Sequence, residues 1–523
     1  MPDSDLDGVI DLERPTSGGT ECAVIYVGPT SISLLVGVCG DSAAEPVDYL
    51  DRPLPLARDI FRTGTISRQT MEQAAGILRD YLLAVEEYQV PRKRVMLYNT
   101  NILAEASNHE IFLNRLQVTT GLQARLIDDG DMTRLIYQIA LRLLKKQNLL
   151  REAPTFVTHI GPGNTRALYF RDGRLRAYSN YRLGIFRAHE AVAAGESDAA
   201  DHRAHLEQHI SGVVDHLAQD YSWAEVMHHV AIGAELQSVA PRLGAARQGA
   251  IRVSESDLAR LAERLSMLSP DALVRELHLH YSGSEGVVPA LQTNLALARR
   301  FGDEQIWVPE GDFQRELLVD LMTGRPLADT FREEVMQSAH DIGAKYKTDR
   351  KHAEHVTGLA QQLFRELQHL HGLDPRYELL LRVAATLHEV GMFISPREHH
   401  KHSLYILMNT EIFGLSSAER TLVALLARYH RRYNPESKHP HFADLSRAER
   451  MVMFKLAALL RVADALDRSH SQRIQCIQLR LEPGMLYILT PGVDDTTVEQ
   501  LAINSKCDLF REIYGYEILL TQP

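Results

Sequence analysis

The strongest constraint on the fold is a pair of strand, turn and strand segments, each closed by glycine. The first begins at Cys22 and reads CAVIYVGPTSISLLVGVCG, and the second includes VTHIGPGNTRALYF at 157–170. β-Branched and apolar residues flank both turns, a pattern typical of buried β-hairpins. Glycine allows such a turn to present its backbone N–H groups to an anion. The repeat predicts two similar α/β lobes that each open on a hairpin.

The spacing of apolar residues predicts helices and strands that alternate after the first hairpin. Helical spacing covers 69–88, 109–120 and 201–221, and short buried strands are predicted at 94–98 and 227–232. The chain changes character beyond 327–332. Twelve of the 24 histidines fall between His340 and His441, within long helical patterns. After His470 the order strand, turn, strand, helix and strand predicts a small α+β unit.

These observations give the predicted domains. They are a disordered acidic tail at 1–20, a first lobe at 21–140, a second lobe at 141–325, a helical domain at 326–472 and a small α+β domain at 473–523.

Composition excludes several classes of protein. The 523 residues carry a formal charge of −11, with 45% hydrophobic and 24% charged residues, so we expect a soluble globular protein without nucleic-acid or membrane partners. No segment is predicted to span a membrane. The four cysteines show no paired metal-binding spacing, and we expect reduced thiols and a cytoplasmic location.

Two duplicated lobes with glycine hairpins resemble the actin-like ATPase superfamily. In detail the chain resembles the exopolyphosphatase and guanosine pentaphosphate phosphohydrolase (Ppx/GppA) family, most specifically through LLRVAATLHEVG (380–391), LARYHRR (426–432) and LAALLRVADALDRSH (456–470). The resemblance implies an α/β fold of two actin-like (ribonuclease H-like) lobes, an all-α HD-like domain and a small α+β unit. It also implies polyphosphate or a phosphorylated nucleotide as ligand, Mg²⁺ or another divalent metal, and a homodimer.

The resemblance fails where the family carries its catalytic groups. Carboxylates that hold Mg²⁺, a glutamate that activates water and an arginine that binds phosphate are replaced, and the replacements are Tyr26, Ala104, Met132, His159 and Arg166. Glu235 also enters a phosphate loop. Removing a general base alone costs about 10²–10⁴ in rate, so we expect the usual hydrolysis to be lost. The alternative is a substitute base, Asp131 or Asp129, beside the family position at Met132.

The residues that match the family's phosphate loops are the predicted phosphate-binding set. They are Gly28, Ser31, Gly161, Gly163, Asn164, Thr165, Arg166 and Gly233. The exchange of acids for His159 and Arg166 suggests a metal-independent phosphate sensor, in which Arg166 contacts the anion directly. The alternative is a cleft that has drifted, with Arg166 solvated.

The histidine-rich region also resembles the HD phosphohydrolase superfamily. His352, His388 and Asp464 match that pattern, while Glu389 stands at the position of an aspartate. Together with two further histidines, the predicted metal ligands are His352, His388, Glu389, His402, His430 and Asp464, with His400 as another candidate. Three interpretations remain open: histidines that pack in a helical core, a bound metal with a structural or binding role, and an active HD hydrolase.

Three functions therefore follow from the sequence. The first is an exopolyphosphatase-like protein with a degenerate site that binds polyphosphate or a phosphorylated nucleotide, or acts as a regulator. The second is retained hydrolysis of polyphosphate or guanosine pentaphosphate through non-standard residues or through the HD-like domain. The third is a structural partner of an active paralogue.

Overall fold

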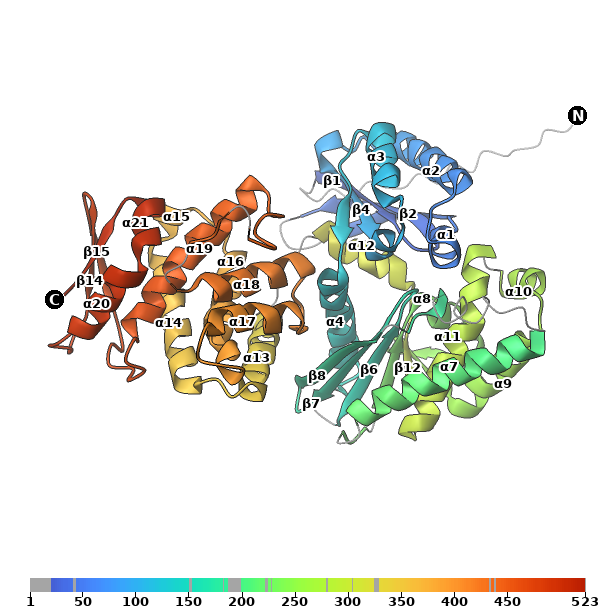
Figure 1. Ribbon diagram of the computed structural model, residues 1–523. Helices are drawn as coiled ribbons and strands as arrows, with labels where there is room; N and C mark the ends of the chain where they lie inside the picture. Colours follow the sequence, from blue (N-terminus) through green and yellow to red (C-terminus); the bar gives the residue numbers. More distant parts are fainter. Residues whose placement is uncertain are drawn as a thin grey trace, which may run out of the picture. The chain divides into compact units, whose positions relative to one another are not determined.

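The computed structural model of the protein forms two compact units (Figure 1). It describes residues 20–40, 44–149, 153–181, 183–186, 199–221, 224–226, 228–278, 281–302, 304–323, 329–431, 434–436 and 439–522. Within these ranges, the first unit contains 20–127 and 139–323, and the second contains 128–138 and 329–522. None of the helices described here has the length and apolar character needed to cross a membrane.

The first lobe is a five-stranded sheet covered by helices. Its strand order is β3-β2-β1-β4-β5, with β1 parallel to β4 and antiparallel to β2. The strands are β1 (Thr20–Val27), β2 (Ser31–Cys39), β3 (Ala44–Pro53), β4 (Val95–Thr100) and β5 (Arg125–Ile127). The helices are α1 (Leu56–Thr63), α2 (Arg68–Glu87), η1 (Arg92–Arg94), η2 (Asn101–Glu105) and α3 (His109–Thr120). Ser67 caps α2 by accepting the Thr70 N–H, as an N-cap serine does.

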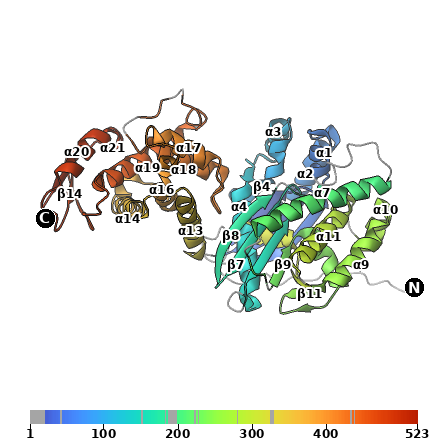
Figure 2. The same ribbon diagram turned by 60° about the horizontal axis from the view of Figure 1, so that its bottom comes forward.

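The second lobe contains a seven-stranded sheet of order β10-β11-β12-β9-β6-β7-β8. Its strands are β6 (Thr155–Ile160), β7 (Thr165–Arg171), β8 (Arg174–Tyr181), β9 (His228–Ile232), β10 (Ala246–Arg247), β11 (Ala250–Ser254) and β12 (Gln305–Pro309). Its helices are α7 (Ala199–Asp220), α8 (Ala234–Val239), η3 (Ala240–Arg242), α9 (Glu255–Ser266), α10 (Pro270–Leu277) and α11 (Tyr281–Phe301). Helix α12 (Phe313–Thr323) follows β12 in the chain and packs on β1, β2 and β3 of the first sheet. Figure 2 shows α7 lying across this sheet, where Leu206 and Ile210 share a core with Phe156.

The two sheets repeat one topology, as the paired hairpins predict. In each, an antiparallel three-stranded meander is followed by a strand parallel to its first strand: β1, β2, β3 then β4, and β6, β7, β8 then β9. Parallel pairing needs a crossover between strands, and helices α2 and α7 provide it. The predicted α/β fold class is confirmed, and the glycine turns after β1 and β6 lie at equivalent places.

The expectation of four reduced thiols is wrong for two of them. Cys22 and Cys39 form a disulfide, with their Cα atoms 6.1 Å apart. The hairpin register explains the pairing, because Thr20 lies opposite Cys39 and Cys22 lies opposite Gly37 on the neighbouring strand. Sequence spacing alone did not reveal this proximity. Cys476 and Cys507 are free thiols.

The second unit is mainly helical. Its helices are α13 (Asp329–Lys345), α14 (Arg350–Glu366), α15 (Gln368–His371), α16 (Arg376–Leu387), η4 (Val390–Phe393), α17 (His399–Met408), α18 (Ser417–Tyr429) and α19 (Arg447–Leu466). Helix α4 (Asp129–Lys146) contributes its first turns to this unit and its remainder to the first unit. Helices α18 and α19 both start with a capping box, Ser416 with Glu419 and Ser446 with Glu449.

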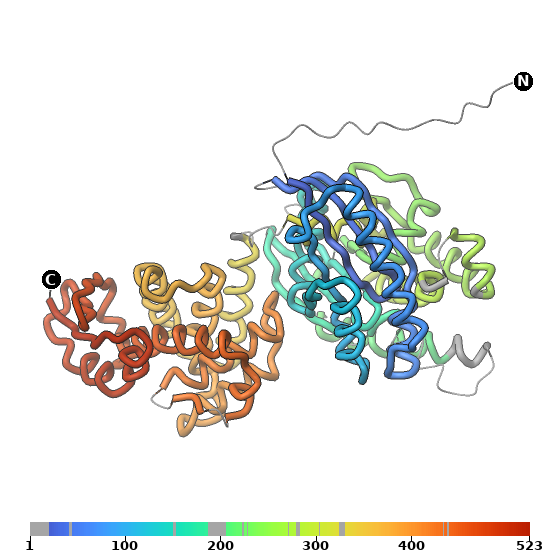
Figure 3. The backbone as a smooth tube through the Cα atoms, turned by 90° about the horizontal axis from the view of Figure 1, so that it is seen from above, coloured from blue at the N-terminus to red at the C-terminus, as the bar shows by residue number. Residues whose placement is uncertain are grey.

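A small α+β part completes the second unit. It consists of β13 (Gln478–Glu482), β14 (Met485–Leu489), α20 (Thr497–Lys506), α21 (Asp508–Tyr514) and β15 (Glu517–Thr521), in the predicted order of elements. The sheet order is β13-β14-β15. Helices α20 and α21 pack on α19, and Figure 3 follows the tube from the orange helices into this red segment.

Candidate functional site

A cleft of about 310 Å³ lies between the two lobes of the first unit. We call it the interlobe cleft, and its lining residues are Thr30, Ser31, Asp51, Pro53, Ala234, Glu235, Gln237, Ser238, Gly283, Gly311, Asp312 and Gln314. Helix α8 and the loops after β1 and β12 supply more than half of this lining. Ser31 is the member of the predicted phosphate-binding set that lines it, and its hydroxyl accepts a hydrogen bond from Gln314 Nε2 at 3.2 Å.

The glycine turns are present, but their N–H groups bind internal acceptors. Gly28 N–H donates to the Ser31 carbonyl and Gly161 N–H to the Asn164 carbonyl, both at 2.9 Å. Gly233 N–H donates to Gln237 Oε1 at 3.2 Å, and Gln237 Nε2 donates in turn to the Gly311 carbonyl. An N–H group already bonded inside its own loop contributes little to holding an anion. The phosphate-loop shape therefore persists with these three donors engaged.

The other predicted phosphate-binding residues hold the second hairpin together. Asn164 Nδ2 donates to Asn180 Oδ1 at 3.0 Å, and Thr165 Oγ1 donates to the Leu183 carbonyl at 2.6 Å. A side chain at Gly184 would collide with the backbone of Gly163 at 2.3 Å. These contacts tie the turn to the segment after β8.

Three residues that the resemblance places at the family's metal positions, Tyr26, His159 and Arg166, are buried. His159 and Arg166 are paired across β6 and β7, and Arg166 is only 2% exposed, with Nη1 donating to Asn164 Oδ1 at 3.4 Å. Burial and the nearby Arg166 lower the pKa of His159 to about 3, so its ring is neutral. Burial raises the pKa of Tyr26 to about 12, and its hydroxyl is hydrogen-bonded to Thr100. A guanidinium cannot ligate a cation and repels one, so these residues do not fit the magnesium ion that the family implies.

Carboxylates line the cleft instead. Burial raises the pKa of Glu235 to about 7. Asp51 Oδ1 accepts the Ser33 hydroxyl at 2.7 Å, and Asp312 Oδ1 accepts the Gln314 N–H at 2.8 Å, at the start of α12. No lysine or arginine occurs among the described lining residues. No sequence pattern indicates Asp51 or Asp312, because both reach the cleft only through sheet order and loop geometry.

Asp131, the predicted substitute base, belongs to the second unit. It lines a cavity of about 480 Å³ together with residues of α16 and α18, such as Tyr377 and Leu422. Its carboxylate lies 3.4 Å from Arg134, and burial raises its pKa to about 6. The linings of this cavity and of the interlobe cleft share no residue.

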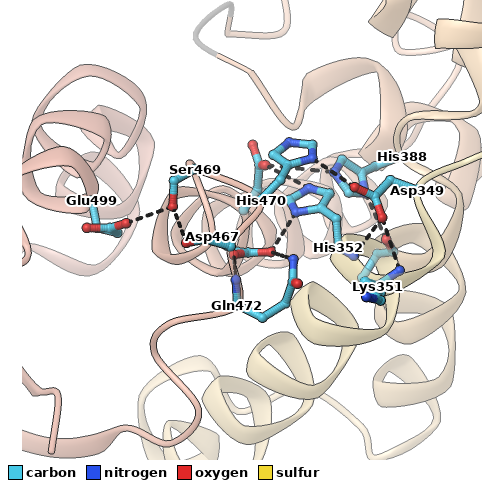
Figure 4. Close-up of polar contacts among 12 residues, drawn as sticks. Asp349, Lys351, His352, His388, Asp467, Ser469, His470, Gln472 and Glu499 are labelled. Atoms are coloured by element: carbon cyan, nitrogen blue, oxygen red, sulfur yellow. Dashed lines mark hydrogen bonds and ion pairs between the residues drawn. The ribbon is translucent and has the colours of Figure 1, made fainter. Parts of the chain in front are cut away.

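A second candidate site is a buried cluster in the helical unit. His352 on α14, His388 at the end of α16 and Asp464 on α19 have ligand atoms within 4.8 Å of one another. We call these three residues the histidine centre. Asp464 Oδ1 lies 3.6 Å from His352 Nε2 and 3.8 Å from His388 Nε2. Figure 4 shows the His352 and His388 rings side by side, with centroids 5.3 Å apart.

The orientation of both rings is fixed by their other nitrogens. His352 Nδ1 is hydrogen-bonded to Asp467 Oδ2 at 2.8 Å, and His388 Nδ1 to the Ala385 carbonyl at 2.7 Å. The two Nε2 atoms are buried and have no hydrogen-bond partner. Metal-ligating histidines are held in this way, by a carboxylate or carbonyl on the nitrogen away from the ion. The histidine centre therefore fits a divalent metal.

Charge is balanced within the histidine centre. Burial lowers the pKa of His352, but contacts with Asp464 and Asp467 outweigh it and raise that pKa to about 9. Burial favours protonation of Asp464, yet Lys506 and the two histidines hold its pKa well below the usual range. Asp467 lies within the segment LAALLRVADALDRSH (456–470) but was not predicted to act at this site, and no motif marked Lys506.

The other predicted ligands lie around the histidine centre. Glu389 forms a second grouping with His352 and His470, a residue that the sequence analysis did not select; the His470 ring stacks on His352 at 3.7 Å. Both nitrogens of His430 have partners, the Ala427 carbonyl at 2.7 Å and His399 Nε2 at 3.2 Å. His402, on α17, is in neither grouping found among the described residues.

Two models of one protein family match most of the chain. The family model described as "Ppx/GppA phosphatase family" matches residues 43–322, and "Ppx/GppA phosphatase, domain III" matches 335–485. A guanosine-5'-triphosphate,3'-diphosphate pyrophosphatase of Aliivibrio fischeri is 23% identical over 449 residues, covering 84% of this chain and 86% of the relative. The same-named protein of Aeromonas hydrophila is 23% identical over 412 residues, covering 77% and 79%.

A solved structure gives the fold. An exopolyphosphatase from Cytophaga hutchinsonii shares 16% identity and a TM-score of 0.50, over 59% of this chain and 100% of that one. At this identity the likeness shows the fold alone, which is that of two actin-like lobes.

Proposed function

The chain belongs to the Ppx/GppA phosphatase family, and on this premise we propose that its interlobe cleft binds a phosphate polymer or a phosphorylated guanosine nucleotide without hydrolysing it. The observation that carries the proposal is the buried pair of His159 and Arg166 at the positions of the family's acids. The Arg166 guanidinium can neither ligate a cation nor accept a proton, and its charge repels a cation from the neighbouring His159 ring, whose lowered pKa makes it a weak base. The residues at these two positions therefore do not support the family's route of hydrolysis by metal and glutamate.

The ligand class follows from the names of the relatives. Two are named guanosine-5'-triphosphate,3'-diphosphate pyrophosphatase, and the similar solved structure is an exopolyphosphatase. The described lining of the cleft carries Asp51, Glu235 and Asp312 and no basic side chain, so a bare polyanion is repelled. We expect the ligand to enter as its magnesium complex, with the carboxylates facing the cation. Direct contact between Arg166 and phosphate is not part of the proposal, because Arg166 is buried.

The test combines phosphate release with binding. The full chain is mixed with polyphosphate or guanosine pentaphosphate and Mg²⁺, and free phosphate and heat of binding are both measured. We expect Mg²⁺-dependent binding, weakened by Glu235→Gln and unchanged by Glu263→Gln on the exposed face of α9. Phosphate release that survives His388→Ala but is lost in Glu235→Gln would contradict the proposal and favour hydrolysis through non-standard residues.

A second candidate function is phosphohydrolysis at the histidine centre. It is favoured by two buried Nε2 atoms that point toward one carboxylate oxygen. His352, His388 and Asp464 would hold the ion, and a bound divalent ion lowers the pKa of its water and polarises a phosphoryl oxygen. Two imidazoles with one carboxylate suit Zn²⁺ or Mn²⁺. Metal analysis of the purified protein tests this candidate: loss of both the ion and any phosphate release in His388→Ala supports it, and an unchanged metal content contradicts it.

A further inference from the structure

Lys506 is a buried lysine that reaches the histidine centre from the small α+β part. It ends α20, is 8% exposed, and its Nζ donates to Asp464 Oδ2 at 2.7 Å. The domain III model of the family ends at residue 485, so Lys506 lies beyond the matched region. The Lys506 ammonium group is therefore bonded to Oδ2 of Asp464, while Oδ1 of the same carboxylate faces His352 and His388.

Arg461 holds the Lys506 segment in place. Its side chain is fully buried and donates to the Tyr429 carbonyl at 2.9 Å, to the Lys506 carbonyl at 3.3 Å and to Asp508 Oδ1 at 3.0 Å. One guanidinium therefore joins the end of α18, the end of α20 and the start of α21. Arg461 bonds both the carbonyl of Lys506 and the side chain of Asp508, two residues later. These two hydrogen bonds limit how far the Lys506 ammonium group can move.

The ligand atoms left for a metal are few. With Oδ2 bonded to Lys506, Asp464 offers Oδ1 alone, while His352 and His388 each offer one Nε2. The second grouping, of His352, Glu389 and His470, needs the same His352, whose Nδ1 is bonded to Asp467. A single metal ion in a catalytic site typically has three protein ligands and leaves its other positions open to water or substrate.

We propose that Lys506 takes the place of a second cation and limits the histidine centre to one divalent ion. The inference rests on the proposed metal-binding function of that centre. The ammonium prevents Asp464 from chelating the ion with both oxygens or from bridging two ions. Its charge also opposes the ion's charge across the same carboxylate, in a buried site where screening is weak. Lys506 is therefore a residue that sets metal number and affinity.

The experiment counts ions in the full chain. The protein is stripped with a chelator, reloaded with Zn²⁺ or Mn²⁺, and examined by elemental analysis and calorimetric titration. We expect one ion per wild-type chain, absent in His388→Ala. Lys506→Met frees Oδ2 and should bind the ion at least about tenfold more tightly or take up a second ion. Lys506→Arg keeps the charge and should behave like wild type.

Two further variants keep the test decisive. Lys506→Met leaves a buried carboxylate without its partner before metal is added, so Lys506→Gln, which can still donate to Oδ2 but is neutral, replaces it if folding fails. Lys455→Met is the matched control, since Lys455 is a partly buried lysine of the same unit that donates to the His371 carbonyl. It should leave the metal number and affinity unchanged.

The outcomes separate the two proposals. Two ions in the wild type, or wild-type affinity and number in both neutral Lys506 variants, contradict the role of Lys506 and leave the metal centre standing. No ion in the wild type but one in Lys506→Met supports Lys506 as the cation and contradicts the metal-dependent function. No ion in any variant, or an ion that persists in His388→Ala, contradicts the metal centre itself.

Discussion

The interlobe cleft and the histidine centre differ in what each retains: the cleft region keeps its glycine turns, and the histidine centre keeps its metal-ligating side chains. Beside the cleft the glycine turns remain, yet His159 and Arg166 stand where the resemblance predicts acids, and the Gly233 N–H is bonded to Gln237. In the histidine centre the ligand atoms remain and their second shell is complete, with both Nε2 atoms pointing inward. A loop's shape depends on glycine and on internal hydrogen bonds, whereas chemistry depends on which atoms are left unbonded. The comparison teaches that the surviving turn is the weaker sign of function.

The largest expected effect is loss of a ligand from the histidine centre. His388→Ala removes one of three protein ligands and should weaken metal binding by at least about 100-fold, since even second-shell changes cost about 10–100-fold. Equilibrium dialysis against Zn²⁺ or Mn²⁺ measures the change. His402→Ala is the control, because His402 lies outside both ligand groupings found in the described residues. Equal losses in the two variants would show that the triad does not hold the ion.

A smaller loss is expected one shell further out. Asp467 Oδ2 accepts from His352 Nδ1 and Gln472 Nε2, so Asp467→Asn weakens the group that fixes the His352 tautomer. Metal affinity should fall by about 10- to 100-fold, with the protein still folded. Asp341→Asn, at an exposed aspartate of α13, serves as the comparison in the same dialysis. If Asp467→Asn binds like wild type, the second shell of the centre has no bearing on the ion.

The buried His159 should make the first unit sensitive to acid. His159 has a folded-state pKa of about 3 against about 6.5 when unfolded, so the unfolded chain binds the extra proton. Its contribution to the stability of the first unit is complete above pH 6.5 and is lost as pH falls toward 3. Between pH 7.5 and pH 5 the loss is about 2 kcal/mol. His159→Gln should remove that part, as measured by hydrogen exchange of β6 and β7 amides in urea. An identical pH response in the variant would mean that the ring is not buried neutral.

The smallest effect concerns the Gly233 loop. Gln237→Ala removes the acceptor of the Gly233 N–H and the donor to the Gly311 carbonyl, which should cost about 1 kcal/mol of unfolding free energy. It also leaves the Gly233 N–H open to an anion. Gln73→Ala, which loses one exposed hydrogen bond to the Pro53 carbonyl, is the comparison, and urea unfolding measures both. Equal stability in the two variants would show that Gln237 does not hold the loop.

The parts of the molecule that local patterns govern could be predicted. Glycine turns and β-branched runs revealed both hairpins, because a strand's periodicity lies in adjacent residues. The resemblance to the HD superfamily indicated His352, His388 and Asp464, which the structure brings within ligand distance of one another. Asp51, Asp312 and Lys506 could not be found in this way. Each reaches its site through packing between distant segments, and none belongs to a motif.

The predictions of reduced cysteines and of a base at Asp131 share one weakness, because both relied on positions along the chain. Cys22 and Cys39 carry no spacing signal, and strand register alone brings them together. Asp131 was chosen for its place beside Met132 in the chain, but it lines a cavity of the second unit. The position of a residue in the sequence does not by itself show which of the two units the end of its helix packs against.

The position of Lys506 late in the chain also means that it is synthesised after the residues of the histidine centre. His352 and His388 are synthesised well before the segment that Arg461 fastens at Lys506 and Asp508. A chain synthesised only as far as α19 contains His352, His388 and Asp464 but lacks the lysine that donates to Asp464 Oδ2.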